Sequence, residues 1–255
     1  MATLLTNEQI AAYRTKGYLV IRSALTEHEV AVLQQECVRL RETPHLVDPN
    51  NIRSGHRVID GEQRIEKIDP CHDASPVLAD LVADERILSP LRDIYLDEPK
   101  LFKDKLIFKL PGQPGYGMHQ DAGWWQGFPY EQLTSVMVAI DGANAANGGL
   151  ELFPGCHHEL RSTPGVLQNM GPDAIAEIDE STGELVETRA GDLIFFNSLV
   201  PHRSGTNAAD VSRTQLYLTY SPAAAGDLYR AHYQHYRRYA YGEKLTEPGN
   251  TYYFR

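Results

Sequence analysis

Apolar positions in the first third of the chain recur at the spacing of helices that bury one face. Residues 26–29, Thr-Glu-His-Glu, form a capping-box pattern, and the apolar positions behind it lie three or four residues apart: Val30, Leu33, Cys37 and Leu40. A similar pattern at residues 6–9 predicts a short helix that ends near Gly17, before a strand at residues 18–21. Ser75-Pro76 opens one or two further helices, up to about residue 96.

After Pro99 the pattern changes to short runs of aromatic and branched residues, separated by turn signals such as Pro-Gly and Asn-Gly-Gly. The runs cover residues 101–110, 135–140, 150–153, 193–197 and 215–220. Many short strands joined by glycine-rich turns are typical of a sandwich or barrel. Tyrosines at helical spacing near the end predict a last helix packed on the barrel: Tyr229, Tyr233 and Tyr236.

Residues 42–63 are polar, contain Pro, Asn, Asp and Gly, and show little periodicity. We predict a long loop there, and loops of this kind are often lids or binding segments. The chain has no internal repeat, low-complexity tract or linker between domains. Residues 1–255 are therefore expected to form a single domain, with the helical amino-terminal third packed on a β core from about residue 100 onward.

The charge and the cysteines narrow the choice of partners. The formal net charge is −10, from 34 acidic and 24 basic residues, which argues against nucleic acid or an anionic membrane as the main partner. A small anion held by one or two buried arginines remains possible. The three cysteines are far apart and give no disulfide framework, which fits a reducing compartment. With no secretory signal and no apolar run of ~18 residues, a cytoplasmic protein is expected.

The most informative segment contains His119 and Asp121, one residue apart. On a strand such side chains point to the same face, so the two could share one metal ion with Gln120 turned away. A His-x-Asp triplet is weak by itself, because solvated polar groups on a surface strand look the same. Support comes from His202, which follows the strongly apolar run 193–196, and from Arg213 at the start of the last predicted strand.

Two imidazoles and one carboxylate on one metal form the facial triad of non-haem iron oxygenases, which leaves three coordination positions open. Those positions can take the two donor oxygens of a 2-oxo acid and one oxygen molecule. A nearby arginine can pair bidentately with the distal carboxylate of that acid.

A His-x-Asp pair, followed by a distant His-x-Ser-x-x-Asn and an arginine, resembles the phytanoyl-CoA dioxygenase family of 2-oxoglutarate enzymes. The order of helices, strands and turns is similar over nearly the whole chain, including residues 6–25 and 147–157. The resemblance implies a double-stranded β-helix, the jelly-roll or cupin-like barrel of two facing sheets. It also implies a hydroxylase that uses iron(II), 2-oxoglutarate and O2 to oxidise a C–H bond of a small-molecule metabolite, with release of succinate and CO2.

Site residues carry over from the family by position. His119, Asp121 and His202 would be the iron ligands. Arg213 and Ser204 would bind the far carboxylate of 2-oxoglutarate. A second group of positions matches less closely or departs from the pattern: Lys67 lies where some members place a co-substrate-binding lysine, and Met137 lies where certain relatives have a tryptophan.

Asp121 also distinguishes two reactions within the wider family. Related halogenases have a small residue at this position, which leaves a metal site open for chloride. A carboxylate there favours hydroxylation over halogenation.

Other chemistry-bearing residues have plainer interpretations. Trp124 and Trp125 follow the metal motif, and each is expected with even odds to line the substrate pocket or to belong to the core. Lys109 and Gln113 lie on the approach to the site, where a solvated loop is expected and substrate contact is the alternative. His157 is expected to bond to the backbone near a turn.

Two competing functions remain: a metal-dependent hydrolase or isomerase on the same barrel, and a non-catalytic barrel that binds a ligand. The substrate and the oligomeric state stay open.

Overall fold

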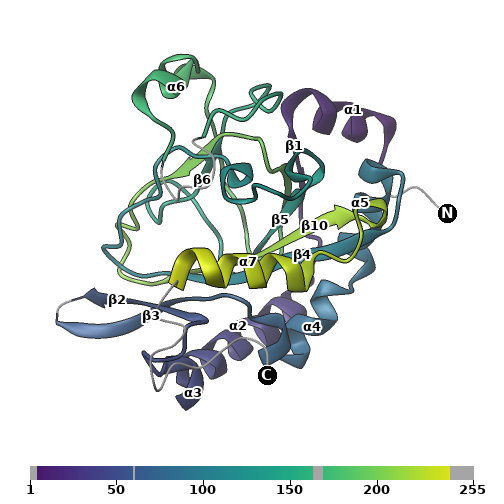
Figure 1. Cartoon of the computed structure of the whole chain (residues 1–255). Coiled ribbons are helices and arrows are strands. Elements are labelled where there is room, and N and C mark those ends of the chain that lie inside the picture. Colours follow the sequence, from purple (N-terminus) through teal and green to yellow (C-terminus); the bar gives the residue numbers. More distant parts are fainter. Residues whose placement is uncertain (1–4, 60, 163–168, 242–255) are drawn as a thin grey trace.

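Two antiparallel sheets form the centre of the computed structural model, which describes residues 5–59, 61–162 and 169–241 (Figure 1). The larger sheet has the order β1-β8-β5-β10-β4-β3-β2, and its strands are Tyr18–Ile21 (β1), Ser54–Ile59 (β2), Glu62–Ile68 (β3), Pro99–Lys109 (β4), Thr134–Ala139 (β5), Leu193–Asn197 (β8) and Arg213–Pro222 (β10). The smaller sheet has the order β7-β6-β9, and its strands are Leu150–Leu152 (β6), Glu184–Val186 (β7) and His202–Ser204 (β9). The strand runs expected after Pro99 are all present.

Strand β5 is buried on both faces, and its alternating side chains separate two apolar layers. Met137 and Ala139 point into the barrel, where they pack against Leu150 and Leu152 of the smaller sheet. Val136 and Val138 point the other way, into the core shared with the helices. The sheets therefore face each other across one layer, and the helices cover the outer face of the larger sheet.

The α-helices are Asn7–Lys16 (α1), Glu27–Glu42 (α2), Pro44–Val47 (α3), Pro76–Val82 (α4), Glu85–Tyr95 (α5), Pro172–Ala176 (α6) and Tyr229–Tyr241 (α7). Short 3-10 turns cover His72–Ala74, Asp121–Trp124, Tyr130–Gln132, Glu180–Thr182 and Ala223–Ala225. Both capping boxes are present, with the hydroxyls of Thr6 and Thr26 accepting from the backbone three residues on. Helices α2 and α4 lie together below the larger sheet in Figure 1. The helices expected after Thr6, after Thr26 and from Pro76 to about residue 96 are present.

The long loop expected at residues 42–63 is wrong. The segment contains α3 and β2, and it runs into β3 through a turn at Gly61 with φ +80. Strands β2 and β3 pair as an antiparallel hairpin at the edge of the larger sheet. Edge strands with two partly exposed faces lack the apolar alternation by which a strand is recognised, and here cross-strand pairs such as Arg57 with Glu66 at 2.7 Å replace it.

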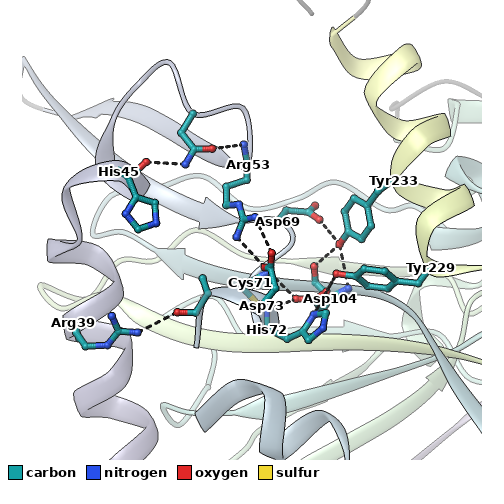
Figure 2. A network of polar contacts seen from close by, with 12 residues as sticks. Arg39, His45, Arg53, Asp69, Cys71, His72, Asp73, Asp104, Tyr229 and Tyr233 are labelled. Atoms are coloured by element: carbon teal, nitrogen blue, oxygen red, sulfur yellow. Dashed lines mark hydrogen bonds and ion pairs between the residues drawn. The ribbon is translucent and has the colours of Figure 1, made fainter. Parts of the chain in front are cut away.

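Helix α7 is held on the barrel by a buried polar network (Figure 2). Asp104 of β4 accepts hydrogen bonds from the Cys71 amide at 2.6 Å and from the Tyr229 hydroxyl at 2.7 Å. Asp69 accepts from the Tyr233 hydroxyl at 2.9 Å and from the Lys103 ammonium at 2.6 Å. The packing of the last helix is therefore confirmed, and it depends on tyrosine hydroxyls as well as on apolar contact.

None of the helices within the described ranges combines the length and the apolar character that a bilayer crossing requires.

Candidate active site

His119 and His202 lie directly opposite each other at the mouth of the barrel. The His119 amide donates to the His202 carbonyl at 3.0 Å, and the His202 amide donates to the His119 carbonyl at 2.9 Å. This isolated antiparallel bridge places both side chains on one face, with ring centroids 4.2 Å apart. Two residues 83 positions apart in the chain thus come into contact through backbone pairing.

Asp121 reaches the same place by a different route from the one expected. His119 belongs to no regular strand and forms only the isolated bridge, and Asp121 begins the 3-10 turn Asp121–Trp124. The Ala122 amide fixes this turn by donating to the Ser198 carbonyl at 3.0 Å. Gln120 is turned away, as expected, and its side-chain amide donates to the Leu199 carbonyl at 2.7 Å. Ligand-type atoms of His119, Asp121 and His202 lie within 4.8 Å of one another.

Backbone carbonyls set the tautomers of both imidazoles. Nδ1 of His119 lies 2.8 Å from the Gly117 carbonyl, and Nδ1 of His202 lies 2.9 Å from the Val200 carbonyl. Because a carbonyl can only accept, each Nδ1 carries the proton and each Nε2 keeps a free lone pair. The two Nε2 atoms are therefore prepared as metal ligands.

The protonation states also suit a metal. Burial lowers the pKa of His119 to about 3, and the charge on His202 adds to this effect. Burial likewise lowers the pKa of His202. For Asp121 burial alone would raise the pKa, but the charges of His202 and Lys105 outweigh it and lower the pKa. Near neutral pH the group thus offers two neutral imidazoles and one carboxylate, the donor set that iron(II) takes in facial-triad sites.

A buried arginine, Arg213, lines the same cavity as these three residues. Arg213 is 3% exposed, and its Nη1 donates to the Gly148 carbonyl at 2.9 Å. Its Nε is buried and has no hydrogen-bond partner within the described parts of the chain. A buried donor without a partner costs free energy unless a ligand fills it, and a carboxylate fits a guanidinium best. The residues therefore fit the distal end of a 2-oxo diacid.

Lys109 is a residue that the sequence interpretation placed wrongly. It is fully buried at the end of β4, directly opposite Arg213, and Gln113 is buried as well, so neither lies in a solvated loop. The Lys109 ammonium donates to the Ser204 hydroxyl at 3.0 Å and to the Gly205 carbonyl. Ser204, Arg213 and Lys109 thus form one polar wall. Because side chains alternate along a strand, Lys109 is on the same face of β4 as the residue at position 103, and the sequence could have shown this.

The wall and the triad open on a cavity of about 180 Å³. Trp124 and Trp125 both line it, and Trp125 also packs against Phe102 in the core. Lys67 lines the cavity too, but its ammonium donates to the Tyr236 hydroxyl at 3.4 Å, a side chain of α7. The remaining lining includes residues that the sequence gave no reason to select: Lys103, Lys105 and His232.

A barrel of two facing antiparallel sheets, with two imidazoles and a carboxylate at its mouth and a buried arginine beside them, defines the class of iron(II)- and 2-oxoglutarate-dependent dioxygenases. The chain belongs to the phytanoyl-CoA dioxygenase family, whose model, Phytanoyl-CoA dioxygenase (PhyH), matches residues 13–215. The resemblance seen in the sequence is thereby confirmed.

Individual relatives agree with this assignment. A methylphosphonate hydroxylase of Gimesia maris is 29% identical over 93% of this chain and 89% of its own length. A 2-aminoethylphosphonate dioxygenase of an uncultured bacterium is 27% identical over 87% of this chain and 84% of its own length. The structure of EctD from S. alaskensis with 2-oxoglutarate and 5-hydroxyectoine is 25% identical, covers 87% of this chain and 77% of that one, and has a TM-score of 0.77. The jelly-roll fold is confirmed.

Proposed function

We propose that this chain is an iron(II)- and 2-oxoglutarate-dependent hydroxylase of a small-molecule C–H bond, with His119, Asp121 and His202 as its metal ligands. The observation that carries the proposal is the convergence of these three side chains within 4.8 Å, beside the buried and unfilled Nε of Arg213. The whole chain, 1–255, would act as one catalytic domain. Relatives named for phosphonates support a small-molecule substrate.

When bound, iron(II) and 2-oxoglutarate supply the oxidising power: one O2 is reduced, the co-substrate becomes succinate and CO2, and the substrate gains a hydroxyl group. The chain's own residues hold and orient these groups. Arg213 and Ser204 bind the far carboxylate of the co-substrate. Lys109 adds a second positive charge at that end. Lys67 stays a prediction as a co-substrate contact, and its hydrogen bond to Tyr236 favours another place in the cavity.

The Asp121 carboxylate also bears on which reaction follows. Its pKa is lowered, so it is ionised and available to the metal, and it occupies the position that a halide would need. Ser135 donates to Asp121 Oδ2 at 3.3 Å and keeps the carboxylate oriented. Hydroxylation is therefore proposed, and halogenation is not.

Succinate formation tests the proposal. The purified chain, given iron(II), 2-oxoglutarate and O2, is expected to form succinate slowly by itself and faster when a small-metabolite screen supplies the substrate. Removal of iron by a chelator, or of O2, should stop the reaction. A metal-dependent hydrolase or isomerase on the same barrel would form no succinate, and a non-catalytic barrel would also take up no iron. Either result would overturn the proposal.

The affinity for 2-oxoglutarate should depend on pH through Lys109. Burial, followed by the charge of Arg213, lowers the pKa of Lys109 to about 8. Below pH 8 the ammonium attracts the co-substrate dianion, and above pH 8 this attraction is lost, so the Kd should rise about tenfold between pH 7 and 9.5. The neighbouring Tyr116 has a raised pKa and stays neutral in this range.

Tryptophan fluorescence measures this titration. In Lys109→Met the Kd for 2-oxoglutarate should already be high at pH 7 and should change little up to pH 9.5. Lys100→Gln, an exposed position on the same strand, should keep the wild-type profile. A profile that survives in Lys109→Met would assign the pH dependence to another group.

A further inference from the structure

The sheet wall of the cavity carries lysines in addition to Lys109, which lies beside Arg213. Lys103 and Lys105 are two residues apart on β4 and point to the same side, toward the cavity. Lys67 of β3 pairs with Ile107 of β4 and points to that side as well. Asp69 lines the cavity with these lysines, and their charges lower its pKa although burial alone would raise it.

The single carboxylate in this group does not neutralise it. Asp69 forms a 2.6 Å ion pair with Lys103, which is itself nearly buried. Lys105 has no carboxylate within ion-pair distance in the described parts of the chain, and its ammonium lies 5.2 Å from the ring centroid of Tyr217. Among the described lining residues the other carboxylate, Asp121, is committed to the metal in the proposed function. The described lining residues therefore keep a positive charge in the cavity of a chain whose formal net charge is −10.

Lys105 is also close to the metal group. Burial would raise the pKa of Asp121, which is lowered first by the charge of His202 and next by that of Lys105. The pKa of His202 is lowered mainly by burial, and the charge of Lys105 acts in the same direction. The same charge acts on Asp69, on the side of α7. Lys105, the metal group and side chains of α7 all line the same cavity. A small molecule held by Lys105 would have its neighbouring carbon atoms within the space in front of the metal ligands.

His232 of α7 supplies an unfilled polar group in the same cavity. Its side chain lines the cavity and is 3% exposed, yet neither ring nitrogen has a hydrogen-bond partner among the described residues. Burial, followed by the charge of Lys103, keeps its pKa well below the usual value, so the ring is neutral and offers one donor and one acceptor. Two unfilled nitrogens on a buried imidazole are costly unless a ligand or water satisfies them.

The wall that carries His232 is fixed. Tyr229 and Tyr233, on the same helix, donate to the carboxylates of Asp104 and Asp69, and Figure 2 shows both tyrosines directed at this network. The Lys103 ammonium lies 5.1 Å from the ring centroid of Tyr236, which also accepts from Lys67. The lysines and the imidazole are therefore held in place before any ligand arrives, which reduces the entropy cost of binding.

We propose that Lys67, Lys105 and His232, here called the anion site, bind an oxyanion group of the substrate, so that the substrate is a small organic acid such as a phosphonate or carboxylate. The co-substrate has its own cations in Arg213 and Lys109, and the anion site adds charge that 2-oxoglutarate does not need. This inference rests on the proposed function, because it places the acid beside the metal-bound co-substrate.

The two tryptophans of the chain provide the measurement, because Trp124 and Trp125 both line the cavity. Their fluorescence is followed while methylphosphonate, butyrate or the neutral dimethyl methylphosphonate is added to the iron(II)-loaded protein with saturating 2-oxoglutarate and no O2. At least one anion is expected to change the fluorescence saturably and to bind more weakly as salt is raised, and the neutral ester is not. The comparison of methylphosphonate with butyrate tells which oxyanion is preferred.

Substitution locates the site. Lys105→Gln and Lys67→Gln should each raise the Kd of the preferred anion about ten- to a hundredfold, the effect of one lost charge-assisted hydrogen bond. Lys100→Gln removes the same charge from an exposed position on β4 and should change the Kd less than about twofold. Lys105→Gln and Lys100→Gln should bind 2-oxoglutarate nearly as the wild type does.

Three results would overturn the inference: a wild-type protein that binds none of the anions, equal binding of the neutral ester, or equal Kd values in Lys105→Gln and Lys100→Gln. The same titrations without 2-oxoglutarate separate this inference from the proposed function. If the anion binds through Lys105 but the chain forms no complex with 2-oxoglutarate, the anion site is supported and the proposed hydroxylase function is contradicted. If the chain forms succinate but does not bind the anions, the hydroxylase function is supported and the anion site is contradicted.

Discussion

The Asp121→Ala variant is expected to form succinate at less than about a thousandth of the wild-type rate, because loss of the ligand removes several kcal/mol of charge stabilisation at the metal. The two imidazoles alone leave an incomplete donor set, so the iron content after gel filtration should fall as well. The fold should survive, because burial of the Asp121 carboxylate costs free energy when no metal is bound. Its removal also leaves no other buried group of the described residues without a hydrogen-bond partner.

Metal analysis and succinate assays on the same preparation check this prediction. Glu131→Ala, which removes an exposed carboxylate ten residues away, is the matched control and should behave as the wild type. The circular dichroism spectra of both variants should match the wild type. Full iron content together with normal turnover in Asp121→Ala would remove this residue from the ligand set.

The Arg213→Ala variant is expected to raise the KM for 2-oxoglutarate about a hundredfold or more, the cost of losing a buried charge-assisted pair of hydrogen bonds. The maximal rate should change less, because Arg213 contacts the end of the co-substrate that does not react. Arg213→Lys should recover part of the loss, since one charge returns without the planar two-donor geometry.

Initial rates of succinate formation over a wide range of 2-oxoglutarate concentrations separate KM from kcat. Arg189→Ala removes an exposed arginine and should leave both unchanged. If Arg213→Ala keeps the wild-type KM, the co-substrate lies elsewhere and Lys67 becomes the candidate for its far carboxylate. In that case 2-oxoglutarate would use Lys67, and the proposal that Lys67 binds the substrate anion would no longer be supported.

Local features account for the parts of the fold that the sequence predicted. The capping boxes at Thr6 and Thr26 each need only hydroxyls and amides three residues apart, so they can be read without the rest of the chain. The buried runs that became β5 and β8 are apolar on both faces, and few other structures suit such a sequence. The hairpin β2–β3 was not predicted, because its side chains are mostly polar and it lies at the edge of the sheet. There the pairing of β3 with β4 decides the structure.

The candidate site divides in the same way. The sequence by itself determined the three proposed ligands, His119, Asp121 and His202, because the order of a His-x-Asp pair and a later histidine after an apolar strand is a property of the chain. Their convergence, through a single backbone bridge and a 3-10 turn, was decided by the tertiary structure.

The charged cavity was likewise decided by the tertiary structure. Lys105 and Lys109 look like ordinary surface residues in the sequence, and His232 lies more than a hundred residues beyond them. Whether a lysine faces water or a cavity depends on strand register, because a shift of one position turns every side chain to the opposite face. That register is set by long-range pairing of β4 with β10 and β3, which local patterns do not encode.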